Sequence, residues 1–280
     1  MTARVNAWAR HLSPLMVRVV SGVLLLAATV ALLVIGLYGI YVIALVAGGV
    51  ALWEFRGLSD RWGFRAPSWL LYPLGVCFAL SGTVLKAVPL DVVLSIALIA
   101  GLSMFLVLPG AREGIGRWAM GLAGALYIGL PFNYYLLIYQ GAHRAPGLTW
   151  LLLIVATVVV SDAVALLIGQ RLGRHAFFAA ISPKKTVEGA MAGLVCSVPV
   201  MLVAGVLLLH LNPLHSAVLG LLIGVTAQIG DLVESQMKRL AGVKDSSHLI
   251  PGHGGILDRM DSAMFPPIVV FLYAHSLGLL

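Results

Sequence analysis

The sequence predicts an all-α polytopic membrane protein with about nine transmembrane helices and a cytoplasmic N-terminus. Of its 280 residues, 60% are hydrophobic and only 10% are charged, whereas about a quarter of a typical soluble domain is charged. In hydrocarbon every backbone N–H and C=O must be paired within the protein, so spans are helices or closed barrels. Barrel strands alternate in polarity, but this chain runs apolar over long stretches, which favours helices.

Each candidate span is an apolar stretch of about 20 residues, the length that crosses a bilayer as a helix. The first two stretches are nearly fused, and only Gly36, Tyr38 and Gly39 mark the expected turn between them. We expect no cleaved signal peptide, because the first stretch carries no convincing cleavage site and another span follows at once. The candidates cover approximately residues 18–35, 37–53, 69–85, 90–108, 117–139, 149–170, 188–210, 214–230 and 264–280.

The positions of the cations predict the orientation, because cytoplasmic loops are rich in Lys and Arg. With the N-terminus inside, 16 of the 18 Lys and Arg residues fall in cytoplasmic segments, and only Lys86 and Arg144 fall outside. The opposite orientation would reverse this ratio. The net charge of +7 is therefore mostly a topology signal that also suits anionic lipids or substrates, and it does not indicate nucleic acid.

The distribution of charged and polar residues divides the chain at residue 148. Residues 1–148 are predicted to form N-terminal transmembrane helices with short basic loops, and their few acids form no cluster. Residues 149–280 form a predicted catalytic transmembrane region with motifs on its cytoplasmic side. Within it, the segment 231–261 holds nine of the chain's 29 charged residues, so we expect the chemistry there.

The first polar motif continues the eighth span towards the cytoplasm. At 3.6 residues per turn, Asp231, Glu234, Ser235 and Lys238 lie on one helix face, with Arg239 beside it. An acid at the end of a membrane span is costly and marks a functional site by default. An ordinary ion pair with Lys238 is the alternative for Glu234, whereas Asp231 has no cation four residues away.

The second polar motif is rich in glycine. Glycines around His253 let backbone N–H groups approach an anion closely. Mg²⁺ usually takes one or two carboxylates together with substrate phosphates, so acids beside cations fit a metal–phosphate site. The members that could serve it are Lys244, Asp245, His253, Gly254, Gly255, Asp258, Arg259 and Asp261.

A third motif precedes the seventh span. Ser182 as N-cap and Pro183 at the first helical position predict a helix start. Lys184 and Lys185 in that first turn oppose the helix dipole unless an anion such as a phosphate binds there. A topology signal from these two lysines is the alternative.

The fourth feature is a carboxylate inside a span. Asp162 lies deep in the sixth span, between apolar neighbours. An ionised carboxylate facing lipid would cost several kcal/mol. We therefore expect Asp162 to face a polar cavity or a partner such as a lysine.

These four segments resemble the phosphatidate cytidylyltransferase (CDP-diacylglycerol synthase) family. The family's C-terminal signature reads Ser-x-x-Lys-Arg-x4-Lys-Asp, a short spacer, and His-Gly-Gly-x-x-Asp-Arg-x-Asp. The segments 230–232 and 182–186 also match, so the resemblance covers roughly residues 160–262 in detail. The fixed positions are all present, as Ser235, Lys238, Arg239, Lys244, Asp245, His253, Gly254, Gly255, Asp258, Arg259 and Asp261.

The resemblance implies transfer of the cytidylyl group of CTP to phosphatidate, giving CDP-diacylglycerol and pyrophosphate for phospholipid biosynthesis. It implies Mg²⁺ on Asp231 and Asp258, where a second, monovalent cation such as K⁺ could share the site. Catalytic roles fall to Asp231, Lys238, Arg239, Lys244, Asp245, Asp258, Arg259 and Asp261. Substrate-binding roles fall to Ser182, Lys184, Lys185, Ser235, His253, Gly254, Gly255 and Asp162.

His253 is expected to donate to a phosphate or to pack the loop, since a phosphate monoester dianion needs no base. The expected surroundings are the lipids of a bacterial inner (cell) membrane, with the active site facing the cytoplasm. The resemblance also implies a homodimer, and nothing in the sequence suggests a nucleic-acid partner.

Two alternatives remain open. An ion-coupled transporter could use Asp162 and Asp231 as ion sites, although the charges gather at one face and no inverted repeat of broken spans is visible. Alternatively, CTP could react with another membrane-embedded acceptor, such as a polyprenyl lipid, because the motifs specify phosphates and metal but not the lipid tail. A purely structural protein is disfavoured by the cost of burying so many charges without a ligand.

Overall fold

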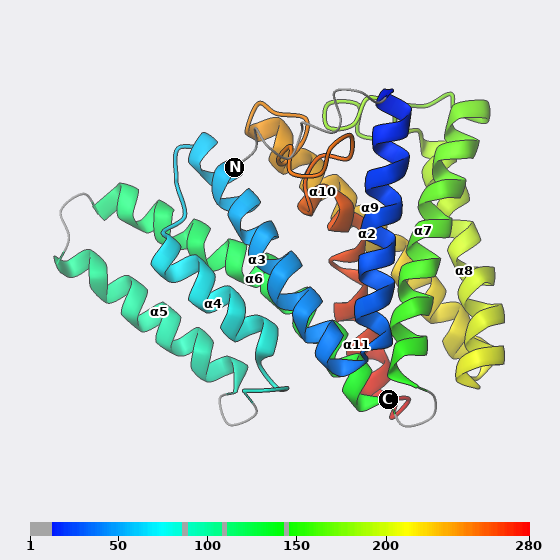
Figure 1. Ribbon diagram of the computed structural model, residues 1–280, viewed down its shortest axis with the longest axis horizontal. Coiled ribbons are helices and arrows are strands. Elements are labelled where there is room, and N and C mark those ends of the chain that lie inside the picture. Colours follow the sequence, from blue (N-terminus) through cyan, green and yellow to red (C-terminus); the bar gives the residue numbers. More distant parts are fainter. Residues whose placement is uncertain (1–12, 86–88, 108–110, 143–145) are drawn as a thin grey trace. The chain divides into compact units, whose positions relative to one another are not determined.

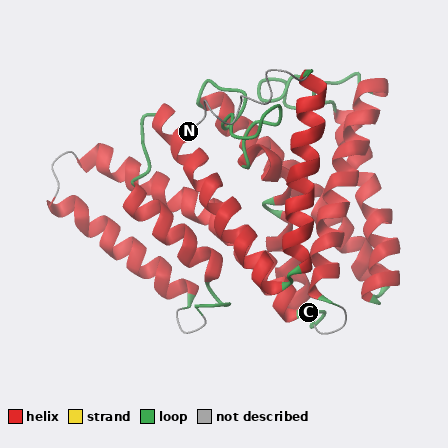
Figure 2. Cartoon of the chain, viewed as in Figure 1, coloured by secondary structure: helices red, strands yellow, loops and turns green. Residues whose placement is uncertain are grey.

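The computed structural model describes residues 13–85, 89–107, 111–142 and 146–280, and these residues form helices and loops without a β-strand (Figure 2). The α-helices are α2 (Pro14–Val34), α3 (Leu37–Arg61), α4 (Ser68–Leu80), α5 (Leu90–Val107), α6 (Ala111–Gly141), α7 (Gly147–Leu172), α8 (Val187–Leu209), α9 (Pro213–Leu240), α10 (Leu257–Met260) and α11 (Pro266–Ser276). A 3₁₀ turn, η2 (Asp261–Ala263), connects α10 to the segment before α11.

Among the described residues, six helices are long and apolar enough to cross a membrane, namely α2, α3, α6, α7, α8 and α9. The apolar helices α4 and α5 are shorter. The prediction of an all-α fold is therefore confirmed for the described residues, and the six long apolar helices support a membrane protein. The number of nine spans and the cytoplasmic N-terminus stay predictions, and the loop cations Lys86 and Arg144 lie outside the described residues.

The turn between the first two spans forms where the sequence predicts it. Helix α2 ends at Val34 and α3 begins at Leu37. Gly36 between them has φ 77°, a conformation that side chains disfavour. A Cβ on Gly39 would overlap the carbonyl oxygen of Leu32, so glycine is required where the two helices meet.

The chain forms two compact units. Unit 1 comprises the described parts of Met1–Asn133 together with Leu240–Met260, and unit 2 comprises the described parts of Tyr134–Arg239 together with Asp261–Leu280. The chain thus passes from one unit to the other within the polar motifs. The division predicted at residue 148 concerns chemistry rather than packing, and it stays a prediction.

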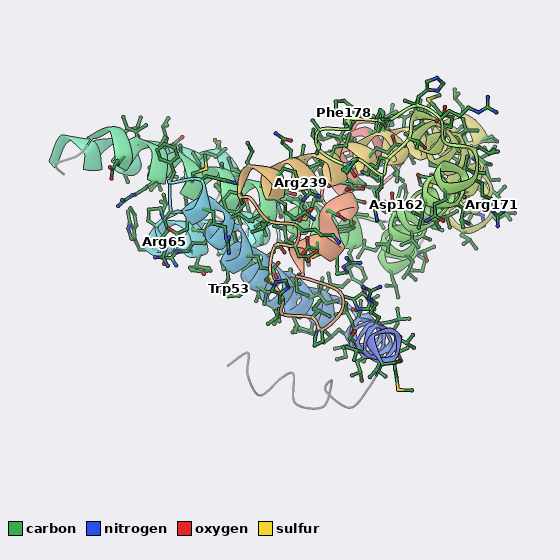
Figure 3. All side chains as sticks on the ribbon, turned by 90° about the horizontal axis from the view of Figure 1, so that it is seen from above. Trp53, Arg65, Asp162, Arg171, Phe178 and Arg239 are labelled. Carbon is green, nitrogen blue, oxygen red and sulfur yellow. The ribbon has the colours of Figure 1, made fainter. Side chains whose placement is uncertain are left out.

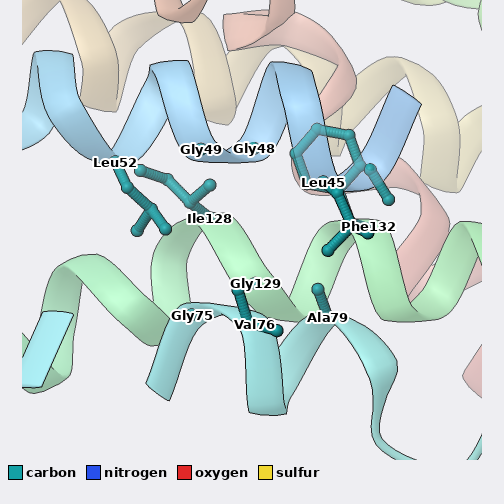
Figure 4. Close-up of a pocket in the computed structure, with 11 residues that line it drawn as sticks. Leu45, Gly48, Gly49, Leu52, Gly75, Val76, Ala79, Ile128, Gly129 and Phe132 are labelled. Carbon is teal, nitrogen blue, oxygen red and sulfur yellow. The ribbon is translucent and has the colours of Figure 1, made fainter. Parts of the chain in front are cut away.

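In unit 1, glycines allow α3, α4 and α6 to approach closely, as small residues do between membrane helices. Gly75 of α4 lies against Leu52 of α3, and Gly124 of α6 lies against Phe55 of α3. A small pocket remains between these three helices (Figure 4). Because all its lining side chains are apolar or absent, this pocket offers no group for phosphate chemistry.

In unit 2, α7 and α8 run side by side (Figure 1). Gly193 of α8 fits against the backbone of Ser161 in α7, and Gly224 of α9 fits against Ser197 of α8. Close packing through glycine again replaces the bulky ridges of soluble helices. This packing holds α7, α8 and α9 together in unit 2.

Candidate active site

The polar face of α9 forms as the helical periodicity predicts. The hydroxyl of Ser235 donates to Oδ1 of Asp231 at 3.2 Å. One turn further, Lys238 forms an ion pair with the fully buried Glu234. The ordinary ion pair that was the alternative for Glu234 is therefore observed, and Asp231 is the residue of this face that needs another partner.

The partner of Asp231 is Lys185, from the loop that precedes α8. Its ammonium group forms an ion pair with Oδ2 of Asp231, and the two side chains are 28% and 24% exposed. Two side chains with so little exposed surface interact more strongly than an ion pair that is fully exposed to water. Two of the predicted motifs therefore meet at this ion pair.

Asp231 belongs to a group of three carboxylates in unit 2, which we call the acidic cluster: Asp162, Asp231 and Asp261. Asp162 lies on α7 (Figure 3) and accepts a hydrogen bond from Ser262, with Lys185 and Asp231 near enough to act on it electrostatically. The expectation that Asp162 needs polar partners, including a lysine, is confirmed. Ser262 itself was not singled out from the sequence.

The pKa of Asp261 reflects its buried position beside the other two carboxylates of the acidic cluster. The pKa of the Asp261 carboxyl is raised from 3.8 to about 6, chiefly by burial and also by the charges of Asp231 and Asp162, against the lowering effects of the Ser262 backbone N–H and of Lys238. The backbone N–H of Ser262 donates to Oδ1 of Asp261 at 2.7 Å. Additional positive charge in the cluster would favour the ionised form.

Gly230 allows the turn that carries Asp261 to approach α9. A Cβ at this position would overlap the carbonyl oxygen of Asp261. Any side chain would therefore push η2 away from the start of the polar face. This close approach gives a physical reason for glycine immediately before Asp231.

The predicted helix start at Ser182 is wrong. Helix α8 begins at Val187, and its N-cap is Thr186, whose side chain accepts the backbone N–H of Gly189 at 3.2 Å. Ser182 instead begins a turn in which its carbonyl accepts the N–H of Lys185 at 3.1 Å. Ser and Thr both favour the cap position, and the site nearer to the apolar helix prevails. Lys184 and Lys185 thus lie in a turn before the helix.

Arg239, near the end of α9 (Figure 3), supports this turn. Its Nε–H donates to the carbonyl oxygen of Ile181 at 3.1 Å. Glu188 of α8 holds the beginning of the loop between α7 and α8. Its Oε2 accepts the backbone N–H groups of Arg174 and His175 at 3.0 and 3.3 Å. The loop between α7 and α8 is therefore tied to α9 just before Lys184 and Lys185, and to α8 near its own beginning.

In unit 1, the glycine-rich motif forms a compact loop, residues 244–256, which we call the glycine loop. Ile250 and Gly254 exchange backbone hydrogen bonds of 2.8 and 3.1 Å, and Gly252 and Gly254 have φ 75° and 82°. These two glycines are needed for the turn. Asp258 of α10 closes the loop, because its Oδ2 accepts the N–H and hydroxyl of Ser246 at 2.8 and 2.9 Å and the N–H of Gly255 at 2.8 Å.

His253 packs against α2. Its Nδ1 lies 2.9 Å from the hydroxyl oxygen of Ser21, which also lies 2.9 Å from the carbonyl oxygen of Pro251. The ring rests on Gly22, where a Cβ would be 3.4 Å away. Of the two roles expected for His253, loop packing is the one that these contacts support.

The N-terminal half contributes two residues that sequence reasoning missed, Ser21 and Glu54. Glu54 is a buried acid on α3 that accepts hydrogen bonds from Ser247, Ile256 and Leu257. The signal was available, because an acid inside a membrane span is a functional candidate by default. That rule was applied to Asp162 and not to Glu54.

The predicted residues fall into two groups. Unit 2 holds Asp162, Ser182, Lys184, Lys185, Asp231, Ser235, Lys238, Arg239 and Asp261. Unit 1 holds Lys244, Asp245, His253, Gly254, Gly255, Asp258 and Arg259. The predicted metal ligands Asp231 and Asp258 belong to different units, so their pairing stays a prediction.

The acidic cluster does not by itself form a metal site. In the part of the chain that the structure describes, no group of three or more His, Cys, Asp or Glu residues is placed to hold a metal ion. Mg²⁺ does not need one, because it commonly takes one or two carboxylates and completes its shell with water and substrate phosphates. Burial is the main cause of the raised pKa of Asp261, and the neighbouring carboxylates add to it.

Comparison with known proteins identifies the family. The sequence model described as the cytidylyltransferase family matches residues 16–277. A protein named phosphatidate cytidylyltransferase from Staphylococcus epidermidis is 40% identical over 148 residues, which cover 52% of this chain and 55% of that protein. Proteins with the same name from Staphylococcus haemolyticus and Staphylococcus aureus are 40% identical over 149 and 161 residues, covering 52% and 56% of this chain.

The match thus spans only 55–60% of the length of these relatives. The family model nevertheless covers nearly the whole chain, including α2 and α3 as well as the polar motifs. This chain belongs to the cytidylyltransferase family.

Proposed function

We propose that this protein transfers the cytidylyl group of CTP to phosphatidate, giving CDP-diacylglycerol and pyrophosphate. The observation that carries the proposal is the family match over residues 16–277, together with relatives that are named phosphatidate cytidylyltransferase. The ion pair between Lys185 and Asp231 supports it, because it brings a phosphate-binding cation to a candidate metal ligand.

The proposed reaction joins two anions. A phosphate oxygen of phosphatidate attacks the α-phosphorus of CTP, a new P–O bond forms, and the bond between the α-phosphorus and the bridging oxygen breaks. The electron pair leaves with pyrophosphate. Such transfers depend on positioning and on charge stabilisation more than on covalent catalysis, which is what a site rich in fixed cations and backbone N–H groups supplies.

The cations are assigned to the phosphates. Lys184 and Lys185 would bind a substrate phosphate from the turn before α8, where Arg239 holds the carbonyl of Ile181. Lys238, Arg239, Lys244 and Arg259 would contact the triphosphate or the departing pyrophosphate. Ser235 would hold Asp231 in place through its hydrogen bond of 3.2 Å.

Mg²⁺ is the proposed cofactor, with Asp231 and Asp258 as ligands. It would neutralise charge on the phosphate oxygens when bound. Oδ2 of Asp258 accepts three hydrogen bonds from Ser246 and Gly255, which would hold this carboxylate in a fixed orientation. Asp245 and Asp261 would orient the ligands, and a monovalent cation such as K⁺ is a further candidate for the acidic cluster.

The proposed setting is a bacterial inner membrane. The relatives are bacterial, and six described helices are able to span a bilayer. We place the N-terminus and the polar motifs on the cytoplasmic side, where both CTP and the phosphatidate headgroup are available, with nine spans as the sequence predicts. Membrane lipids surround the protein, and a homodimer is proposed from the family resemblance alone.

A lipid panel tests the proposed acceptor. Purified protein in detergent would receive CTP labelled at the α-phosphate, Mg²⁺, and either phosphatidate, a polyprenyl phosphate or a polyprenyl alcohol. We expect labelled lipid in the assay that contains phosphatidate and none in the two assays that contain a polyprenyl lipid. Label in a polyprenyl lipid and none with phosphatidate would replace the proposed acceptor, and substrate flux into liposomes without CTP would favour a transporter.

A further inference from the structure

The feature that the proposed chemistry does not use is Glu54. It lies in α3, inside the candidate span Leu37–Arg61, and only 2% of its surface is exposed. Burying a carboxylate costs several kcal/mol unless hydrogen bonds replace its water. A buried acid in this position therefore needs a compensating set of donors.

The glycine loop and the start of α10 supply these donors. Oε1 of Glu54 accepts the hydroxyl of Ser247 at 2.6 Å and the backbone N–H of Ile256 at 3.0 Å. Oε2 accepts the backbone N–H of Leu257 at 2.7 Å. Both oxygens are thus engaged, and the same carboxylate is bonded to Ser247 near the beginning of the loop and to Ile256 and Leu257 where the loop meets α10.

The fit is close enough to require glycine beside it. A Cβ on Gly255 would overlap both Oε1 of Glu54 and the hydroxyl oxygen of Ser246. Gly255 is one of the predicted phosphate-binding glycines, and its φ angle does not lie in the left-handed region. The structure therefore explains this glycine by the nearness of Glu54, not by an unusual backbone conformation.

A second carboxylate completes the arrangement. Oδ2 of Asp258 holds the N–H and hydroxyl of Ser246 and the N–H of Gly255. Asp258 thus closes the loop on itself, whereas Glu54 fixes the closed loop to a membrane helix. Helix α10, which carries Asp258 and Arg259, contacts α3 accordingly.

We infer that Glu54 is a positioning residue, which holds the glycine loop so that Asp258 and Arg259 are presented in one fixed arrangement. This inference rests on the proposed function of those two residues. Glu54 touches no substrate in this role. It acts through three hydrogen bonds, and it gives the N-terminal half of the chain a part in the reaction.

Glu54→Gln is the test, because it keeps the shape of the side chain but turns one acceptor oxygen into an N–H donor that faces other donors. We expect kcat to fall about 100-fold, as small misplacements of reacting groups do. Hydrogen exchange should increase in peptides that cover residues 244–259 and stay unchanged in α7 and α8. Glu113→Gln is the matched control, because it removes an exposed acid that pairs with Arg117.

Ser247→Ala removes a single donor and serves if Glu54→Gln does not fold. It should slow turnover about three- to tenfold, the worth of one hydrogen bond, with the same local increase in exchange. Full activity of Glu54→Gln would overturn the inference, and so would lost activity without faster exchange in the loop. Increased exchange throughout the protein would show a general structural role instead.

The exchange measurement needs no turnover. If the wild-type protein does not transfer label to phosphatidate, the proposed function is contradicted. Hydrogen exchange in residues 244–259 then still decides whether Glu54 holds the glycine loop. If the wild type is active and Glu54→Gln exchanges like the wild type, the proposed function stands and the inference falls.

Discussion

Lys185 forms an ion pair with Asp231, although one lies in the turn before α8 and the other on α9. The fold brings the two motifs together at this pair. The pair neutralises part of the acidic cluster. It also places a lysine beside the residue that we assign to the metal.

Replacement of Lys185 tests this relationship. Lys185→Met keeps the length and apolar stem of the side chain but removes its charge. We expect kcat/KM for CTP to fall about 10- to 100-fold, the range for a hydrogen bond to a charged group. Arg171→Gln is a suitable control, because it removes an exposed cation of unit 2 outside the proposed site. Equal activity of the two variants would contradict a role for Lys185.

Gly230→Ala tests the close approach of η2 to α9. The added Cβ would overlap the carbonyl oxygen of Asp261, so we expect a loss of about 1–3 kcal/mol in unfolding free energy together with lower activity. Thermal denaturation and the transfer assay measure both. Gly57→Ala adds the same methyl group to α3 in open space and should leave both unchanged or raise stability slightly. A stable, fully active Gly230→Ala variant would show that the contact is unimportant.

The raised pKa of Asp261 predicts a pH dependence of stability. Because the folded protein holds this proton more tightly than the unfolded chain does, stability should fall as pH rises between 3.8 and about 6. The measurement is chemical denaturation across this range in the presence of a chelator. Asp261→Asn removes the titrating group and should flatten this part of the profile. An unchanged slope in the variant would assign the effect to another group.

Local periodicity was sufficient to predict the elements with strong patterns. The spacing of Asp231, Ser235 and Lys238 places them on one face of a helix, and α9 continues far enough to form it. The turn at Gly36 was also predictable, because glycine supplies a backbone conformation that few residues adopt there. In both cases the determining interactions lie within a few residues.

Long-range partners could not be predicted in this way. No local spacing connects Glu54 with Ser247, Ile256 and Leu257, and none connects Ser21 with His253. The N-cap of α8 was predicted wrongly, because two cap-type residues compete and only the packed helix decides for Thr186 over Ser182. The sequence thus predicted which residues are chemically capable, while their partners depended on the tertiary fold.

The decisive measurement follows two labels of CTP in the same assay. With phosphatidate and Mg²⁺, label at the α-phosphate should enter the lipid phase while label at the γ-phosphate appears in water-soluble pyrophosphate, and a chelator should stop both. Asp231→Asn should reduce the rate about 1,000-fold or more, because several kcal/mol of charge stabilisation would be lost, while remaining folded. γ-Label in the lipid, or an active Asp231→Asn protein, would contradict cytidylyl transfer at this site.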